Sequence, residues 1–149
     1  MPDCCIGVDV IVGFPGETKE DFLETYEFLN QLNVSYLHVF TYSERDHTLA
    51  VELPDPVPMS HRQERSRMLH ILSDKKRRAF YQENCGTATS VLFENDVEEG
   101  MMHGFTPNYI RVAVTYDPLL INEIKNVRLT ALNNKGLMLA EDSAPVLVH

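Results

Sequence analysis

Hydrophobic positions near the start of the chain predict two strands separated by one helix. Residues 8–14 form an almost continuous apolar run, which is typical of a strand covered on both faces. Apolar residues then recur at helical spacing, and Thr18 with a carboxylate three residues later predicts a capped helix that begins there. A second apolar run covers residues 36–42. We therefore expect a strand–helix–strand unit whose two strands are parallel.

The remainder of the chain predicts a linker, a long helix and a set of short strands. Residues 50–60 contain three prolines, which argue against regular structure there. Ser60 is the predicted cap of a long helix that ends near Asn84. Short runs rich in β-branched residues then alternate with turn signals, at residues 87–95, 108–116, 126–134 and 135–142. These runs predict a small antiparallel barrel of the oligonucleotide-binding type.

Charge is distributed unevenly along the 149 residues. The net charge of −9 argues against non-specific nucleic-acid binding. Residues 60–85 nevertheless carry seven basic and three acidic side chains, whereas residues 1–59 and 86–149 are both acidic. The basic segment, which includes Arg77 and Arg78, is either a solvated helix face or a patch for an anionic partner.

Several classes of protein are not expected from this composition. No apolar run approaches the roughly 20 residues that span a bilayer, and no secretory signal is present, so we expect no membrane partner. Cys4, Cys5 and Cys85 form neither a disulfide framework nor a metal-binding pattern, which favours the cytoplasm. Because GxGxxG and GxxxxGK[ST] are absent, we expect no dinucleotide or P-loop phosphate site.

The stretch DVIVGFPGET, residues 9–18, bends sharply where the first predicted strand ends. Ligands of α/β folds bind at the carboxyl ends of parallel strands, and glycine lets a ligand approach the backbone. The residues alone support a ligand site and a simple tight turn equally, and they support an anion-binding Arg45 and a local ion pair equally. The candidate positions in the bend and after the second strand are Gly13, Gly16, Glu17, Ser43 and Arg45.

The chain resembles the radical S-adenosylmethionine methylthiotransferases in DVIVGFPGETKEDF at residues 9–22 and in YLHVFTYSERDHTLA at residues 36–50. A long basic helix and a terminal TRAM domain complete the same order of parts, over roughly residues 6–141. Within the family, GFTPNYIRVAV at residues 104–114 is similar to the branch that modifies N6-threonylcarbamoyladenosine in tRNA, beside the anticodon. The branches for isopentenyladenosine in tRNA and for a ribosomal-protein aspartate stay open as alternatives, as does a non-enzymatic RNA-binding module.

The resemblance implies an α/β fragment of a radical S-adenosylmethionine (β/α) barrel followed by a small all-β barrel, TRAM and OB-like. The expected domains are the C-terminal part of the radical barrel with its Pro-rich linker at residues 1–59, a basic connecting helix at 60–85, a TRAM-like β-barrel at 86–142 and a tail at 143–149.

The resemblance also implies the chemistry. Family members hold two 4Fe-4S clusters through cysteine sets that this chain lacks, cleave S-adenosylmethionine with one of them and add a methylthio group to C2 of the adenine. We therefore expect the missing N-terminal portion of the same polypeptide as a partner. No metal, bound cofactor or catalytic residue is expected in this chain, which should be inactive alone.

Two sets of contacts follow from the resemblance. S-adenosylmethionine contacts are expected at Asp9, Gly13, Gly16, Glu17, Ser43 and Arg45. The family's Arg-x-Gly-Thr is Arg45-Asp46-His47-Thr48 here, which leaves the geometry of that loop in question. Contacts with tRNA are expected at Arg77, Arg78, Phe105, Tyr109, Arg111 and Lys125. Packing of Phe105 and Tyr109 inside the barrel is an equal alternative, and exposed strand edges predict a homodimer.

Overall fold

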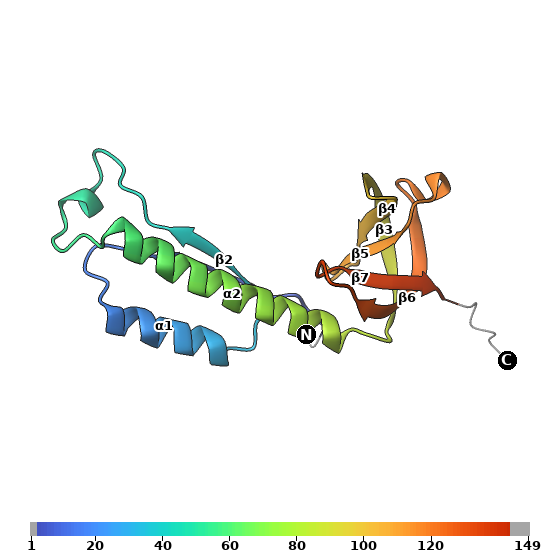
Figure 1. Cartoon of the computed structure of the whole chain (residues 1–149), viewed down its shortest axis with the longest axis horizontal. Coiled ribbons are helices and arrows are strands. Elements are labelled where there is room, and N and C mark those ends of the chain that lie inside the picture. The colour runs from blue at the N-terminus through green and yellow to red at the C-terminus, as the bar shows by residue number, and fades with distance from the viewer. Residues whose placement is uncertain (1–2, 144–149) are drawn as a thin grey trace. The chain divides into compact units, whose positions relative to one another are not determined.

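The computed structural model describes residues 3–143, and their contacts divide into two compact units. One unit, called the α/β unit, comprises Ile6–Arg77; the other, called the barrel unit, comprises residues 78–143 with residues 3–5. The division falls inside one long helix (Figure 1). The helices and strands are β1 (Gly7–Val12), α1 (Lys19–Gln31), β2 (Tyr36–Thr41), the 3-10 turn η1 (Leu49–Glu52), α2 (Met59–Glu83), β3 (Ala88–Glu98), β4 (Met101–Phe105), β5 (Arg111–Thr115), the 3-10 turn η2 (Pro118–Leu120), β6 (Ile124–Leu132) and β7 (Met138–Asp142).

The α/β unit confirms the predicted strand–helix–strand order and the parallel pairing. Strands β1 and β2 pair in register from Gly7 with Tyr36 to Val12 with Thr41. The predicted capping box of α1 is present: the Thr18 hydroxyl accepts from the Asp21 amide at 3.1 Å, and the Asp21 carboxylate accepts from the Thr18 amide at 2.9 Å. The core joins both strands to both helices through Val12, Phe22, Leu29, Leu37, Leu69 and Leu72.

Within residues 3–143 only one face of this two-stranded sheet is covered. Side chains alternate along β1, so that Asp9 and Ile11 point away from the helices. Their register partners on β2 are His38 and Phe40, which are exposed as well. Ile11 and Phe40 are 61% and 52% exposed. The expectation that both faces are covered is therefore not met by the described chain itself.

Helix α2 provides hydrogen-bond partners for the backbone amide and carbonyl of one residue of β2. The buried Ser73 hydroxyl accepts from the Leu37 amide at 2.9 Å and donates to the Leu37 carbonyl oxygen at 2.9 Å. In a parallel ladder the amide and carbonyl of one residue point to the same side of the strand. Ser73 therefore supplies both hydrogen bonds that a neighbouring strand would otherwise make with Leu37.

Two boundaries differ from the sequence prediction. The Pro-rich segment contains one 3-10 turn, η1, although three prolines argued against any regular structure. Helix α2 begins at Met59 rather than after Ser60, because the Pro58 carbonyl accepts from the His61 and Arg62 amides. Proline has no amide hydrogen to lose at a helix start, so Pro58 and the first turn are compatible.

The barrel unit is a closed barrel with strand order β3–β4–β5–β7–β6. Its core contains barrel side chains together with Phe80 and Tyr81 from the end of α2. The predicted all-antiparallel arrangement is wrong for one pair, because β7 lies between β5 and β6 and runs parallel to β5. Strand β4, MMHGF, was not predicted, since its methionines, histidine and glycine carry little strand propensity. Among residues 3–143, no helix combines the length and apolar character needed to cross a membrane.

The Ser73 contact predicts a measurable stability difference. Ser73→Ala leaves the Leu37 amide and carbonyl without their partner, and we expect the free energy of unfolding to fall by about 1–3 kcal/mol. Urea unfolding followed by circular dichroism measures this change. Ser66→Ala, at a half-buried position of the same helix, is the matched control and should lie within about 0.5 kcal/mol of wild type. Equal stability of the two variants would contradict the assignment.

Candidate functional site

The bend that follows β1 is closed by its own side chains. The Gly13 amide donates to the Glu17 carboxylate, and the Glu17 amide donates to the Phe14 carbonyl at 3.0 Å. Gly13 and Gly16 both adopt left-handed backbone conformations, with φ of 80° and 85°. The Gly16 amide donates to the Asp55 carbonyl at 2.9 Å. The bend is therefore a hydrogen-bonded turn that needs glycine for its backbone.

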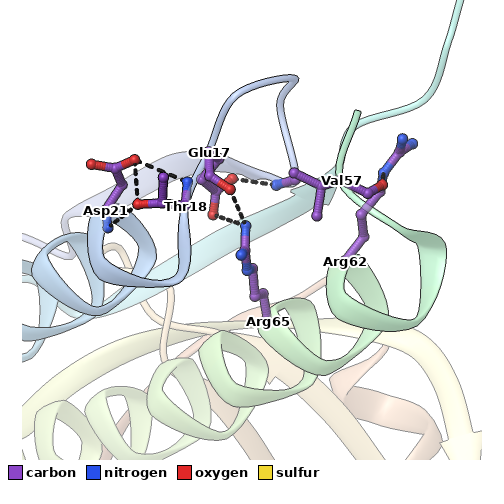
Figure 2. A network of polar contacts seen from close by, with 7 residues as sticks. Glu17, Thr18, Asp21, Val57, Arg62 and Arg65 are labelled. Atoms are coloured by element: carbon purple, nitrogen blue, oxygen red, sulfur yellow. Dashed lines mark hydrogen bonds and ion pairs between the residues drawn. The ribbon is translucent and has the colours of Figure 1, made fainter. Parts of the chain in front are cut away.

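Arg65 of α2 holds Glu17 in place. Its Nη1 atom lies 2.9 Å from Oε1 of Glu17 and donates to the Glu17 carbonyl at 3.1 Å. The guanidinium also lies over the Phe22 ring, 5.5 Å from the centroid. The side chains of Arg65 and Glu17 are only 9% and 16% exposed. Figure 2 shows Arg65 reaching from the helix to the underside of the bend. This ion pair is largely buried, and both partners have additional hydrogen bonds.

Arg62, one helical turn earlier, binds the loop that follows β2 and the segment that precedes α2. Its Nε donates to the Val57 carbonyl at 2.7 Å, its Nη1 to the Tyr42 carbonyl at 3.1 Å and its Nη2 to the Glu44 carboxylate at 2.5 Å. The hydrogen bond from Arg62 lowers the pKa of the Glu44 carboxyl below its usual range. A Cβ atom at Gly13 would overlap the aliphatic stem of Arg62. What approaches the backbone at Gly13 is therefore an arginine of the same chain.

The predicted cofactor-binding residues fall into three places. Gly13, Gly16 and Glu17 form the bend, whereas Asp9 is exposed on the uncovered face of the sheet, opposite His38. Ser43 and Arg45 are exposed in the loop after β2. That loop joins the bend through Tyr42, whose ring meets the Phe14 ring edge-on at 5.2 Å between centroids. Tyr42 also carries a buried hydroxyl for which the described residues provide no hydrogen-bond partner.

His47 adopts the backbone conformation that a glycine would favour. Its φ is 65°, in the left-handed region. The Thr48 hydroxyl donates to the Arg45 carbonyl at 2.8 Å and closes the loop. Histidine tolerates this region better than β-branched residues do. The loop thus accommodates a left-handed residue at the position where the family pattern has glycine.

The described residues do not form a site for an iron–sulfur cluster. Within residues 3–143, no three His, Cys, Asp or Glu side chains are grouped so that they would hold a metal ion. The Cys4 thiol donates to the Cys5 carbonyl at 3.9 Å, and the Cys85 thiol donates to the Tyr81 carbonyl at 3.8 Å. A 4Fe-4S cluster needs several convergent thiolates, which these cysteines do not provide.

Three exposed apolar side chains and one half-buried arginine form one row across the outside of the barrel. Ile124 of β6 pairs with Leu92 of β3, Leu92 pairs with Phe105 of β4, and Phe105 pairs with Arg111 of β5. Residues directly opposite each other in antiparallel strands point to the same face. Ile124, Leu92 and Phe105 are 70%, 46% and 36% exposed. The row, called the barrel row, therefore presents apolar side chains that end at one arginine, and Phe105 does not pack inside the barrel.

An acidic side chain holds the arginine of the barrel row. Asp96 accepts from Nη2 of Arg111 at 2.7 Å and lies 3.1 Å from Nδ1 of the buried His103. The hydrogen bond from Arg111 is the main reason that the pKa of Asp96 lies below its usual range, and His103 adds to the effect. Nε of Arg111 is buried without a hydrogen-bond partner in the described residues.

The other predicted RNA-binding residues are not part of this row. Lys125 pairs with Asp142 at 2.7 Å. Arg77 lies in the α/β unit, over the Tyr36 ring at 5.7 Å, and the exposed Arg78 lies in the barrel unit. Tyr109 is 73% exposed in the turn between β4 and β5, so it does not pack inside the barrel either.

Sequence reasoning missed three functional candidates. Arg62 and Arg65 were grouped with the other basic residues of the helix, although both are buried. Arg128 was not singled out; it is exposed on β6, and its Nη1 donates to the Gly86 carbonyl at 2.6 Å. No signal in the sequence distinguishes these arginines from solvated ones, because the distinction depends on tertiary contacts.

The buried ion pair at the bend predicts strong energetic coupling. Glu17→Gln and Arg65→Met each leave an uncompensated buried charge, and we expect each to lower the free energy of unfolding by about 3 kcal/mol. Because the second substitution removes a charge that is already unpaired, the double variant should lose less than the sum. A double-mutant cycle by urea unfolding measures this coupling. The exposed Arg77–Asp74 pair, 3.9 Å apart, is the matched control and should show coupling near zero. Additive effects at Glu17 and Arg65 would refute the buried pair.

The Asp96 contact predicts an acid-dependent change. Because its pKa is lowered in the folded chain, the ionised carboxylate contributes stability that is present above the unfolded pKa of about 3.9 and is lost as pH falls through the folded pKa. NMR titration of the Asp96 carboxyl should give a midpoint below the ordinary aspartate pKa of about 3.9 in wild type. Arg111→Met should raise that midpoint, since the main hydrogen bond is lost. An unchanged midpoint would argue against the Arg111 contact.

Comparison with known proteins identifies relatives along most of the chain, although no family model matches it. A threonylcarbamoyladenosine tRNA methylthiotransferase of Aquifex aeolicus is 45% identical over 111 residues, which are 74% of this chain and 26% of that protein. The Bacillus subtilis protein of the same name is 35% identical over 87% of this chain and 30% of its own length. A ribosomal protein uS12 methylthiotransferase of Alkaliphilus oremlandii is 37% identical over 67% of this chain and 23% of its own length.

A tRNA-2-methylthio-N(6)-dimethylallyladenosine synthase of Chromobacterium violaceum is 34% identical over 87% of this chain and 30% of its own length. The chain thus spans less than a third of the length of each of these curated relatives. All four are methylthiotransferases by name or by the product they make. On this similarity, which extends over 74% and 87% of this chain for the first two relatives, the chain belongs to the radical S-adenosylmethionine methylthiotransferase family.

Proposed function

We propose that this chain serves as the C-terminal segment of a tRNA methylthiotransferase that adds a methylthio group to C2 of N6-threonylcarbamoyladenosine beside the anticodon. The observation that carries the proposal is the 45% identity with a relative named for that nucleoside, against 37% and 34% for relatives named for a ribosomal protein and for dimethylallyladenosine. The chemistry uses S-adenosylmethionine and two 4Fe-4S clusters. In this proposal the cluster ligands belong to the missing N-terminal portion of the same polypeptide.

The α/β unit contributes one wall of the S-adenosylmethionine pocket in this proposal. Asp9 on the uncovered face and Ser43 and Arg45 in the loop after β2 are exposed and available to a ligand. The bend at the carboxyl end of β1 contributes Gly13, Gly16 and Glu17 to the same wall. Because the Glu17 carboxylate already binds the Gly13 amide and Arg65, its role is to hold the shape of the bend beside the cofactor. The remaining polypeptide supplies the other wall and covers Ile11 and Phe40.

The barrel unit contributes tRNA binding in this proposal. Phe105 in the barrel row offers an exposed ring for stacking on a base, and Arg111 beside it offers a charge for phosphate. Tyr109, Lys125 and Arg78 are further proposed contacts of this unit, and Arg77 is a proposed contact of the α/β unit. Since residues 86–149 are acidic overall, binding depends on these few basic side chains and should weaken as salt is raised.

We also propose that the isolated chain has no catalytic activity. Without the cluster-binding cysteines it does not cleave S-adenosylmethionine, and reductive cleavage by the purified chain after reconstitution with iron and sulfide would overturn this part. The enzyme works in the cytoplasm, where its tRNA substrate is found. A homodimer formed through an exposed strand edge, that of β1, belongs to the proposal as well.

The tRNA of a deletion strain tests the substrate. We expect loss of the methylthio derivative of N6-threonylcarbamoyladenosine when the gene is removed, measured by mass spectrometry of tRNA nucleosides. The methylthio derivative of isopentenyladenosine in the same digest is the internal control and should persist. Its loss instead would move the substrate to the dimethylallyladenosine branch. An unmethylthiolated ribosomal-protein aspartate with normal tRNA nucleosides would establish the ribosomal branch and refute the proposal.

A further inference from the structure

The barrel unit has a cavity that the proposed function leaves unassigned. Its volume is about 670 Å³, within the roughly 300–1,000 Å³ of small-molecule sites. It lies where the end of α2, the start of β3 and the turn between β4 and β5 come together. The wall residues that matter chemically are Asn84, Thr87, Thr89, Pro107, Asn108 and Tyr109. All of them belong to the barrel unit.

Tyr109 stands on this wall in an unfavourable backbone conformation. Its φ is 60°, which is uncommon for a bulky residue, and its side chain is 73% exposed. The Tyr109 amide donates to the Thr106 carbonyl at 3.0 Å, and the Ile110 amide donates to the Thr106 hydroxyl at 2.9 Å. Strained residues persist only where the surrounding structure holds them, and they concentrate at ligand sites. The surrounding structure thus holds Tyr109 in an energetically unfavourable backbone conformation, which places its aromatic ring at the cavity.

The polar wall of the cavity offers mainly hydrogen-bond acceptors. The Asn108 amide nitrogen donates to the Asp3 carbonyl at 3.1 Å and to Oδ1 of Asn84 at 3.3 Å, which uses both of its hydrogens. Oδ1 of Asn108 accepts one bond, from Thr106 at 2.6 Å. The Thr87 hydroxyl donates its hydrogen to the Asn84 carbonyl at 2.7 Å. Both Asn oxygens and the Thr87 oxygen therefore keep a free lone pair, and they suit a ligand that donates.

The charge at the cavity favours a base over a phosphate. Among the described residues that line it, Asp3 alone is charged, and a carboxylate repels phosphate. A cation lies next to the rim instead: Arg128 is the register partner of Ala88, which lines the cavity. One Arg128 bond to the Gly86 carbonyl leaves further N–H groups for a phosphate.

We propose that this cavity takes one unpaired RNA base with an exocyclic amino group, stacked on Tyr109, while Arg128 contacts the phosphate beside it. The inference rests on the proposed RNA-binding role of the barrel unit and assigns it a location separate from the barrel row. Stacking on an aromatic side chain contributes to affinity for any base, and the acceptor-rich wall adds a preference for adenine or cytosine over uracil.

The test uses the whole chain and three single-stranded oligonucleotides of equal length: oligoadenylate, oligouridylate and an abasic strand. Wild type and Tyr109→Phe should bind oligoadenylate alike and more tightly than oligouridylate. Tyr109→Gly suits the left-handed backbone, so it should fold, and its affinity for oligoadenylate should fall by about 5- to 150-fold. Its affinity for the abasic strand should not change. Tyr116→Ala, which removes an exposed tyrosine outside the cavity, is the matched control and should bind as wild type.

Each contrary outcome of this binding test overturns a distinct part of the inference. Oligoadenylate binding that is unchanged in Tyr109→Gly overturns the base cavity and leaves RNA binding by the barrel unit intact. Equal wild-type affinity for oligoadenylate and oligouridylate overturns the preference for an amino group. Failure of wild type to bind any of the three strands overturns the cavity together with the RNA-binding part of the proposed function. The tRNA nucleosides of the deletion strain test the enzymatic part independently of all three.

Discussion

Two buried arginines on consecutive turns of one helix organise the α/β unit. Arg62 and Arg65 are three residues apart and so lie on the same face of α2. Together they donate to the carbonyl oxygens of Val57, Tyr42 and Glu17, which lie where the chain leaves regular structure. A guanidinium has five donors in a fixed plane, so one side chain can satisfy several such oxygens. The loops of this unit thus take their shape from the helix behind them.

This constraint separates the residues that shape the proposed pocket from those that are free to contact a ligand. Gly13 and Glu17 face the arginines, and their requirement for glycine and for a carboxylate is explained inside the chain. Asp9 and Arg45 have no such internal explanation, because they are exposed and no ion pair involves them in the described residues. Substitution of the first kind should act through folding, and substitution of the second kind should act through binding.

The sequence predicted what depends on local chemistry and missed what depends on distant contacts. The capping box at Thr18 and the two parallel strands carry short-range signals and were confirmed. Strand β4 was missed because its residues have weak strand propensity, and it forms only between two neighbours. Burial of Arg62 and the left-handed backbone of Tyr109 leave no trace in the sequence. Phe105 and Arg111 were predicted singly, and only the strand register brings them together.

The hydroxyl of Ser73 has a consequence for how this sheet can grow. Sheets extend when an incoming strand finds a continuous ladder of free amides and carbonyls. Along β2 that ladder is interrupted at Leu37, since both of its groups are already bound by the helix. Along β1 no described side chain makes an equivalent contact with the strand interior. The two edges are therefore unequal, and an added strand, from a longer polypeptide or from a second copy, would meet its continuous template on β1. A single serine thus gives a two-stranded sheet a direction of assembly.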